Sequence, residues 1–383
     1  MKPFPASTAW RLGFSPAVLS FCLLLIDCFL PWPAPAAEAA TSNSKPTAAD
    51  AAWQTLLDAS EPLDPPNEWA KREPTQKEVA RFHLRAAKAA AKSATSAREF
   101  YTRFADHPKA FRARVKECEL LAVAAHLDDR GQKARLDSAR QAVWNEPALT
   151  DDDRFNIRSA GVQRIAYYLQ FKGYIINLDD FDRSVRELRR EFPKRDEPHE
   201  LMLVLAKNRF WDDQMQKARA VAEELATSGG PSSVVEEAGS MLKRFARLGQ
   251  PLSFKFTALD GRSVDLEGMR GKVVLIDCWA TWCAPCLREM PHVKAAYDRY
   301  HARGFEVVGI SSDDDREALE KFVRDNRIPW PQYFDGKGEL NRFASEFNVG
   351  GIPTMWLMDR RGVVRDLNAV SNLTGKIEKM LSE

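Results

Sequence analysis

The spacing of hydrophobic and polar positions changes near residue 249. Before that point, apolar residues recur three and four positions apart, as at Val185, Leu188 and Phe192, and this spacing places them on one face of a helix. After it, short apolar runs alternate with helical stretches, which is typical of a domain that has both strands and helices. The pattern therefore predicts an all-α region over residues 51–248 and an α/β domain over residues 249–383.

The helical region has prolines and glycines at its joints, and two of its segments look alike. Residues 104–123 and 188–205 each show an apolar helix end, a charged turn with proline and a second apolar helix. Such a unit is reminiscent of helix-hairpin repeats of the tetratricopeptide kind, although their full consensus is missing. An irregular helical bundle and a short solenoid both remain open.

The elements of the α/β domain follow from apolar runs and turn signals. Asp260-Gly261 marks a hairpin turn, and acidic residues 313–315 are expected to start a helix because negative charge suits a helix N-terminus. The expected strands are residues 254–259, 263–266, 273–276, 305–310, 332–334, 354–358 and 363–366. The expected helices are residues 283–301, a helix marked by 319–323, a helix through 340–347, and 373–381.

The N-terminus has the layout of a signal peptide. Basic residues precede an apolar stretch, and a run of small residues follows it, so residues 1–36 are predicted to be a signal peptide and residues 37–50 a flexible tether. Asp27 inside the stretch argues against a permanent membrane span, and it fits poorly before a lipid-modified Cys28. We expect an exported protein of the periplasm or cell envelope; an uncleaved N-terminal anchor is the alternative.

Composition adds few constraints. At 383 residues the chain is long enough for more than one core, and its formal net charge of +2 implies no polyanionic partner. No basic stripe interleaved with aromatic residues is present, so nucleic-acid binding is not expected.

The segment Trp282-Cys283-Ala284-Pro285-Cys286 carries the most specific chemistry. Two thiols at this spacing, after an apolar strand and at the start of a helix, lie within reach of a disulfide. The helix N-terminus stabilises the thiolate of Cys283, which we assign as the nucleophile; Cys286, expected to be less exposed, resolves the mixed disulfide. A zinc site would need two further ligands, and a two-residue loop gives a purely structural bridge little stabilisation.

Residues from about 249 to the C-terminus resemble the thioredoxin fold, and within it the TlpA/ResA-like thiol-disulfide oxidoreductases of the bacterial cell envelope. The motifs stand in the order that this family has and cover about the last third of the chain. They are Gly249-Gln250-Pro251, Asp260-Gly261, Gly271 to Asp277, Trp279 to Cys286, Glu289-Met290-Pro291 and Gly351-Ile352-Pro353-Thr354.

The resemblance assigns roles to residues around the dithiol. Pro353 matches a cis-proline that faces the cysteines, and Ile352 would offer backbone groups to an extended substrate. Asp277 matches a buried acid beneath the site and Glu289 an acid one turn beyond the second cysteine, and either could take the proton of that thiol. Trp282 would cover the dithiol and contact substrate.

The remaining cysteines and the histidines indicate no further site. Cys278 stands where the family usually has an aromatic residue and points to the face opposite Asp277; we interpret it, like Cys118, as a buried hydrophobic residue. We expect no metal site and no cofactor.

The sequence thus predicts an exported thiol-disulfide oxidoreductase that reduces disulfides in protein substrates. Its expected partners are protein thiols and disulfides, a membrane-bound electron donor and a protein partner for the helical region. Two alternatives remain: a peroxiredoxin-like peroxidase, and a helical scaffold whose thioredoxin-like part is a binding module. The direction of electron flow does not follow from the residues.

Overall fold

The computed structural model describes residues 47–70, 74–127, 131–169 and 176–383. These residues fall into two compact units, one ending at Asn208 and the other beginning at Arg209. The predicted signal peptide and most of the predicted tether lie outside the described residues. Within the described ranges, no helix combines the length and apolarity that a membrane crossing requires.

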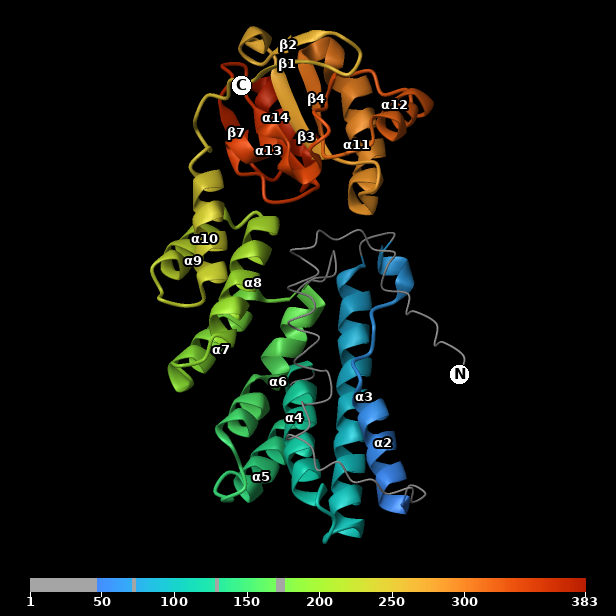
Figure 1. The fold of residues 1–383 in the computed structure, drawn as a ribbon, viewed down its shortest axis with the longest axis vertical. Helices are drawn as coiled ribbons and strands as arrows, with labels where there is room; N and C mark the ends of the chain where they lie inside the picture. Colours follow the sequence, from blue (N-terminus) through green and yellow to red (C-terminus); the bar gives the residue numbers. More distant parts are fainter. Residues whose placement is uncertain (1–46, 71–73, 128–130, 170–175) are drawn as a thin grey trace. The chain divides into compact units, whose positions relative to one another are not determined.

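The first unit is helical, which confirms the prediction for this part of the chain (Figure 1). Consecutive helices pack against each other, α2 on α3, α3 on α4, α4 on α5 and α6 on α7, and α4 also packs on α6. The helices are α2 (Ala48–Ser60), η2 (Asn67–Ala70), α3 (Gln76–Arg103), α4 (Ala110–Leu127), α5 (Lys133–Val143), α6 (Asp151–Leu169), α7 (Leu178–Glu191) and α8 (Glu197–Trp211), of which the last residues, from Arg209 on, belong to the second unit.

Small side chains and a polar cap explain how the long helix α3 forms and packs in this unit. Thr75 caps α3 and accepts a hydrogen bond from the backbone N–H of Glu78, which satisfies a donor that the helix itself cannot. The buried face of α3 carries Ala90, Ala94 and Ala97, whose small side chains let a neighbouring helix approach closely. A similar cap at Thr47 starts α2 at Ala48, so the helix begins before the expected end of the tether.

The two look-alike segments have the same local geometry. A phenylalanine is the C-cap of each first helix: Phe104 follows α3 with φ −124° and ψ 55°, and Phe192 follows α7 with φ −126° and ψ 66°. In both, the phenylalanine N–H donates to the carbonyl four residues earlier, a proline follows within four residues, and the next helix starts five or six residues after the phenylalanine. The sequence similarity therefore reflects a repeated helix-turn-helix joint.

The second unit contains a thioredoxin-like mixed sheet with the strand order β5-β4-β3-β6-β7. Strands β3, β4 and β5 are parallel, while β6 runs antiparallel to β3 and β7 antiparallel to β6, and a separate hairpin joins β1 to β2. The strands are β1 (Lys255–Thr257), β2 (Ser263–Asp265), β3 (Val273–Trp279), β4 (Phe305–Ser311), β5 (Gln332–Tyr333), β6 (Thr354–Met358) and β7 (Val364–Asp366). The helices are α9 (Met215–Ala226), α10 (Ser232–Phe245), η3 (Glu267–Met269), α11 (Ala284–Tyr300), η4 (His301–Arg303), α12 (Arg316–Asp325), η5 (Gly338–Leu340), α13 (Arg342–Phe347) and α14 (Leu373–Ser382).

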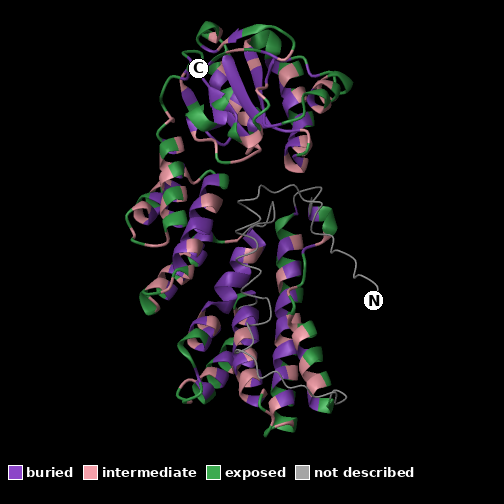
Figure 2. Cartoon of the chain, viewed as in Figure 1, coloured by how far each residue is buried: buried purple, intermediate pink, exposed green. Residues whose placement is uncertain are grey.

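The central strand β3 is buried along its whole length, because helices cover both faces of the sheet (Figure 2). On one face, Leu275 and Trp279 share a core with residues of α11 and α14. On the other, Trp356, which is paired with Ile276, lies against Phe343 of α13 with 6.1 Å between the ring centroids. The predicted strands and helices of this domain are confirmed in order and approximate extent.

One local prediction was wrong, and a second was confirmed only in part. Leu340 was expected on the apolar face of a helix, but it ends the short η5 turn and is 78% exposed, because α13 starts only after the Asn341 cap. Of the acidic run 313–315, only Asp315 caps α12, through the N–H of Ala318. Asp313 turns inward instead and contributes to the site described below.

Helices α9 and α10 belong to the same compact unit as the sheet. The buried Asn368, after β7, donates hydrogen bonds to the carbonyls of Phe210 and Trp211 and to Asp213, each at 3.1 Å. Lys376 of α14 contacts the same aspartate at 3.0 Å. The turn between α8 and α9 is therefore attached to the sheet domain by specific polar contacts.

Candidate active site

The dithiol follows β3 through a turn that hydrogen bonds hold in place. The backbone N–H of Thr281 donates to Asp313 at 3.0 Å, and the Thr281 hydroxyl donates to the same carboxylate at 2.5 Å. Asp313 is 2% exposed and also accepts from the Ser311 hydroxyl at 2.8 Å. The N–H of Ser312 donates to the Trp279 carbonyl at 2.8 Å. The end of β4 thus fixes the segment that leads into the cysteines.

A second anchor lies beneath this turn. The indole N–H of Trp279 donates to the side-chain oxygen of Gln332 at 2.9 Å, inside the core. Gln332 can reach the indole because Gly309 has no side chain; a Cβ there would lie 2.0 Å from the amide oxygen. Sequence reasoning missed both Gln332 and Asp313, since neither stands in a motif.

Cys283 and Cys286 form a disulfide at the start of α11, with 5.2 Å between their Cα atoms. Cys283 is the N-cap, and its sulfur accepts a hydrogen bond from the Cys286 N–H at 3.2 Å. The two residues are 1% and 2% exposed, so the expected difference in exposure is not present: both pack into the core shared by α11 and the sheet. Trp282 beside them is 42% exposed, so part of its indole ring lies open to solvent.

Asp277 lies under the dithiol helix. It alternates with Leu275 and Trp279, so it points to the face of the sheet that α11 covers. Asp277 is 1% exposed, and its Oδ1 accepts no hydrogen bond from the described residues. Burial, with a smaller contribution from the charge of Glu289, raises the pKa of Asp277 to about 7. An acid with that pKa can both accept and release a proton near neutral pH.

Glu289 connects this buried region with solvent. It stands one turn beyond Cys286 on α11 and is 8% exposed, so it is not the solvated helix residue that glutamate often is. Its Oε2 lies 3.2 Å from Nδ1 of His292, whose side chain is 71% exposed. The helix therefore carries a thiol, a carboxylate and an imidazole on successive turns.

The Ile352–Pro353 peptide bond is cis, as the resemblance implies. It directly precedes β6, whose first residue, Thr354, pairs with Cys278 near the end of β3. The bond therefore lies at the edge of the sheet from which the dithiol turn leaves. Ile352 is partly buried against the core that contains both cysteines. The structure thus brings these residues to one end of the sheet, together with the dithiol.

The two free cysteines of the described residues are core residues. Cys278 faces away from Asp277, and burial holds the pKa of its thiol well above the usual value. Burial also raises the pKa of Cys118 to about 12. Both thiols are protonated at neutral pH and make poor nucleophiles. Among the described residues, no group of His, Cys, Asp and Glu side chains has the arrangement of a metal site.

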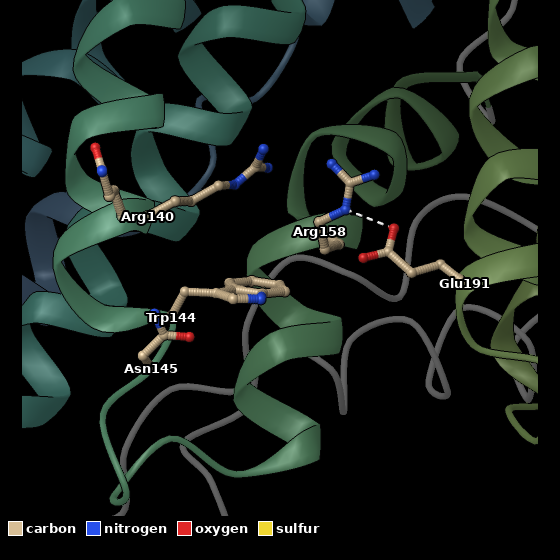
Figure 3. A pocket seen from close by; sticks show the side chains of 6 residues that line it. Arg140, Trp144, Asn145, Arg158 and Glu191 are labelled. Atoms are coloured by element: carbon tan, nitrogen blue, oxygen red, sulfur yellow. Dashed lines mark hydrogen bonds and ion pairs between the residues drawn. The ribbon is translucent and has the colours of Figure 1, made fainter.

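The helical unit has a hollow of its own, with a volume of about 390 Å³, lined by Trp144 and by polar and charged residues (Figure 3). The side chains of Arg140 and Trp144 extend toward an ion pair in which Nε of Arg158 lies 2.7 Å from Oε2 of Glu191. Arg140 forms no ion pair within the described part of the chain and donates only to the Ile157 carbonyl, at 3.3 Å. The sequence had given no signal for this hollow.

Comparison with known proteins supports the resemblance. Residues 248–367 match the model of the AhpC/TSA family. The thiol-disulfide oxidoreductase ResA of a Bacillus cereus strain is 33% identical over 112 residues, which are 29% of this chain and 63% of the relative. That of Geobacillus kaustophilus is 32% identical over 126 residues, which are 33% of this chain and 68% of the relative.

Comparison with solved structures finds matches over about a third of this chain. A putative thiol:disulfide interchange protein DsbE from Chlorobium tepidum is 29% identical, with a TM-score of 0.32, and the match covers 35% of this chain and 97% of that one. The thioredoxin domain of a thiol-disulfide oxidoreductase from Bacteroides vulgatus is 26% identical, with a TM-score of 0.33 and coverage of 35% and 97%. Since the Geobacillus relative is matched over more than two thirds of its length, this chain belongs, through its C-terminal residues, to the family of ResA-like thiol-disulfide oxidoreductases.

Proposed function

We propose that this protein is an exported thiol-disulfide oxidoreductase that reduces disulfides in protein substrates of the cell envelope. The observation that carries the proposal is the Cys283–Cys286 pair at the N-terminus of α11, above a buried acid and at the same sheet edge as a cis-proline. A disulfide at this position can open and close without unfolding the domain, because Cys283 is already placed at the helix terminus that stabilises its thiolate.

The reaction exchanges one disulfide for another. The Cys283 thiolate attacks a sulfur of the substrate disulfide, and the substrate's other sulfur leaves with the electron pair and takes up a proton. The Cys286 thiol then loses its proton and attacks Cys283, so the internal disulfide forms and the second substrate thiol is released. A membrane-bound electron donor would return the pair to the dithiol form.

Side chains around the dithiol have separate roles in this proposal. Ile352 and Pro353 offer the backbone edge along which an extended substrate can pair, and Trp282 supplies apolar contact. Asp277 and Glu289 handle the proton of the second cysteine. The chain spans 63% of the length of the first ResA relative, and the helical region has no counterpart in that match. We assign this region to a protein partner, with the Arg140 and Trp144 hollow as a candidate contact for an acidic group.

The decisive experiment is reduction of insulin by the reduced protein, combined with trapping of substrates. Cys286→Ser should accumulate mixed disulfides with client proteins, because the second cysteine can no longer resolve them, whereas Cys283→Ser should trap almost none. The double serine variant is the control for nonspecific adducts. Equal trapping by the two single variants would contradict the assigned order of attack, and an inactive parent protein would contradict the function.

The match to the AhpC/TSA family makes peroxide reduction the second candidate. Such a peroxidase, in its peroxiredoxin-like form, needs one peroxidatic cysteine after a Thr-x-x spacing and a nearby arginine. Here the corresponding segment holds a complete CxxC, and the Thr281 hydroxyl is bonded to Asp313. Peroxide consumption faster than insulin reduction would favour this alternative over the oxidoreductase.

A further inference from the structure

We infer that His292 is the solvent-side partner through which Glu289 exchanges the proton of Cys286. The inference rests on the proposed function, because it concerns the step in which the second cysteine resolves the mixed disulfide. Nothing in the resemblance to known oxidoreductases assigns a role to this histidine.

The spacing of three residues along α11 carries the argument. Cys286, Glu289 and His292 stand at successive i, i+3 positions, so each side chain is a neighbour of the next on the helix surface. Exposure rises along this row: Cys286 is 2% exposed, Glu289 is 8% exposed, and the His292 side chain is 71% exposed. The row therefore leads from the buried sulfur to water along one element.

The contact between the last two members is direct. Glu289 Oε2 and His292 Nδ1 are 3.2 Å apart, within hydrogen-bond distance, so a proton can reside on either atom. A carboxylate that is 8% exposed exchanges protons with bulk water less readily than an exposed one. An imidazole has two ring nitrogens, so it can take a proton on one side and release another on the opposite side.

The proton balance of the step is closed. Cys286 loses its proton to the Glu289 carboxylate as its sulfur bonds to Cys283, and the bond between Cys283 and the substrate sulfur breaks. The substrate sulfur leaves with the electron pair and is protonated from solvent. Glu289 passes its proton to the imidazole, which releases one to water, so the acid is ready for the next turnover. His292 acts through Glu289 and is a positioning residue for this proton.

Two substitutions separate proton transfer from hydrogen bonding. His292→Ala removes the imidazole, whereas His292→Gln keeps a side chain that can hydrogen-bond Glu289 but cannot relay a proton. The reduced full-length protein is mixed with the chromogenic disulfide dithiobis(nitrobenzoate), and rapid acid quench with mass spectrometry follows the mixed disulfide on Cys283. In both variants we expect the rate of the first attack to be unchanged and the rate of resolution to fall about tenfold. A group that transfers the proton directly usually contributes about a hundredfold or more, and His292 acts only through Glu289.

Rescue by added imidazole distinguishes proton transfer from a structural role, because imidazole in solution would not replace a structural contact of His292. Imidazole added to the solution should restore resolution in His292→Ala, because the vacated position is open to solvent, and should leave the parent unchanged. His301→Gln, which removes another histidine of the same domain, is the matched control and should resolve at the parental rate.

Parental resolution in His292→Gln, or no rescue by imidazole, would overturn the inference. Failure of the proposed function would look different: the parent protein itself would form no mixed disulfide.

Discussion

Replacement of the buried acid Asp277 by asparagine should stabilise the oxidised domain at neutral and alkaline pH. Asp277 lies in a strand that is buried on both faces, and burial together with Glu289 raises the pKa of its carboxyl from the usual 3.8 to about 7. A carboxylate in such surroundings is destabilising whenever it is ionised, because it loses hydration that no hydrogen bond to Oδ1 replaces among the described residues. Asparagine has nearly the same shape and carries no charge.

The sign and size of the effect follow from proton linkage. Below pH 3.8 the carboxyl is protonated in both the folded and the unfolded chain, and it adds no pH dependence. Between pH 3.8 and about 7 only the unfolded chain ionises, so the folded state binds more protons and the free energy of unfolding falls as pH rises. Above about pH 7 the carboxyl is ionised in both states, and the free energy of unfolding falls no further. The shift of the pKa from 3.8 to about 7, at about 1.4 kcal/mol per unit, gives a total loss of about 4 kcal/mol.

The thiol of Cys278 reports unfolding of this domain. It is 3% exposed beside Asp277 in β3, so it should react with a thiol reagent only when the sheet opens. In a background with Cys22, Cys28 and Cys118 replaced by serine, it is the one free thiol of the oxidised chain. Pulse labelling across a urea series then gives the midpoint for this unit alone. A gain of about 4 kcal/mol corresponds to about 2 M urea at an m-value of about 2 kcal/mol per M.

The pH profile of the difference between Asp277→Asn and its parent is the test. The difference in free energy of unfolding should be smallest at about pH 4, should reach about half of its full value near pH 5.5 and should stay constant above about pH 8. Asp260→Asn is the control: the Arg262 hydrogen bond lowers the pKa of Asp260, so its loss should bring no gain at high pH. A difference for Asp277→Asn that does not change with pH would refute the reasoning, because burial of a charge would not be its cause.

Three further predictions concern catalysis, the turn and the domain boundary. Combining Asp277→Asn with Glu289→Gln should leave the rate of the first attack nearly unchanged and slow resolution of the mixed disulfide about tenfold or more near pH 7, as measured by rapid quench. Resolution at the parental rate would mean that both acids have only structural roles. Asp313→Asn should lower stability by about 2 kcal/mol, measured by the same thiol labelling, because buried donors of the turn lose an acceptor; an unchanged midpoint would show that the carboxylate is dispensable. A fragment that starts at residue 249 should fold and reduce insulin. A fragment that starts at residue 209 should unfold at a higher urea concentration, because it keeps the contacts of Asn368. Equal urea midpoints would show that α9 and α10 do not stabilise the domain.

The sequence predicted the sheet domain well because its signals are local. Apolar runs identify β3 and β4, the glycine of Asp260-Gly261 takes the positive φ that its turn requires, and the CxxC spacing places one cysteine at a helix start. Each of these features depends on residues within about ten positions of one another. Burial of Asp277 could also be anticipated, since it directly follows the apolar residues of a strand that is expected to lie inside the domain.

Contacts between distant residues escaped this reasoning. The acidic run 313–315 predicts one helix start, yet Asp313 accepts hydrogen bonds from Thr281, which lies 32 residues away. Whether an aspartate caps the next helix or turns back to an earlier loop depends on how closely the strand ends approach, and no local pattern encodes that distance. The link from Asn368 to the turn after α8 spans 158 residues to Phe210 and is invisible for the same reason.

The placement of Asp277 implies a conflict between stability and reactivity. An ionised carboxylate in the core lowers the free energy of unfolding by several kcal/mol at neutral pH, which is a large part of what holds a domain of this size together. An acid on the surface would avoid that loss, but its pKa near 4 would make it a weak proton acceptor for a thiol. Burial under α11 raises the pKa of Asp277 to about 7, where the carboxylate is basic enough to accept a proton and acidic enough to release it. The surrounding apolar core therefore both stabilises the fold against this cost and tunes the acid, and a variant that relieves the loss of stability should lose speed in the resolving step.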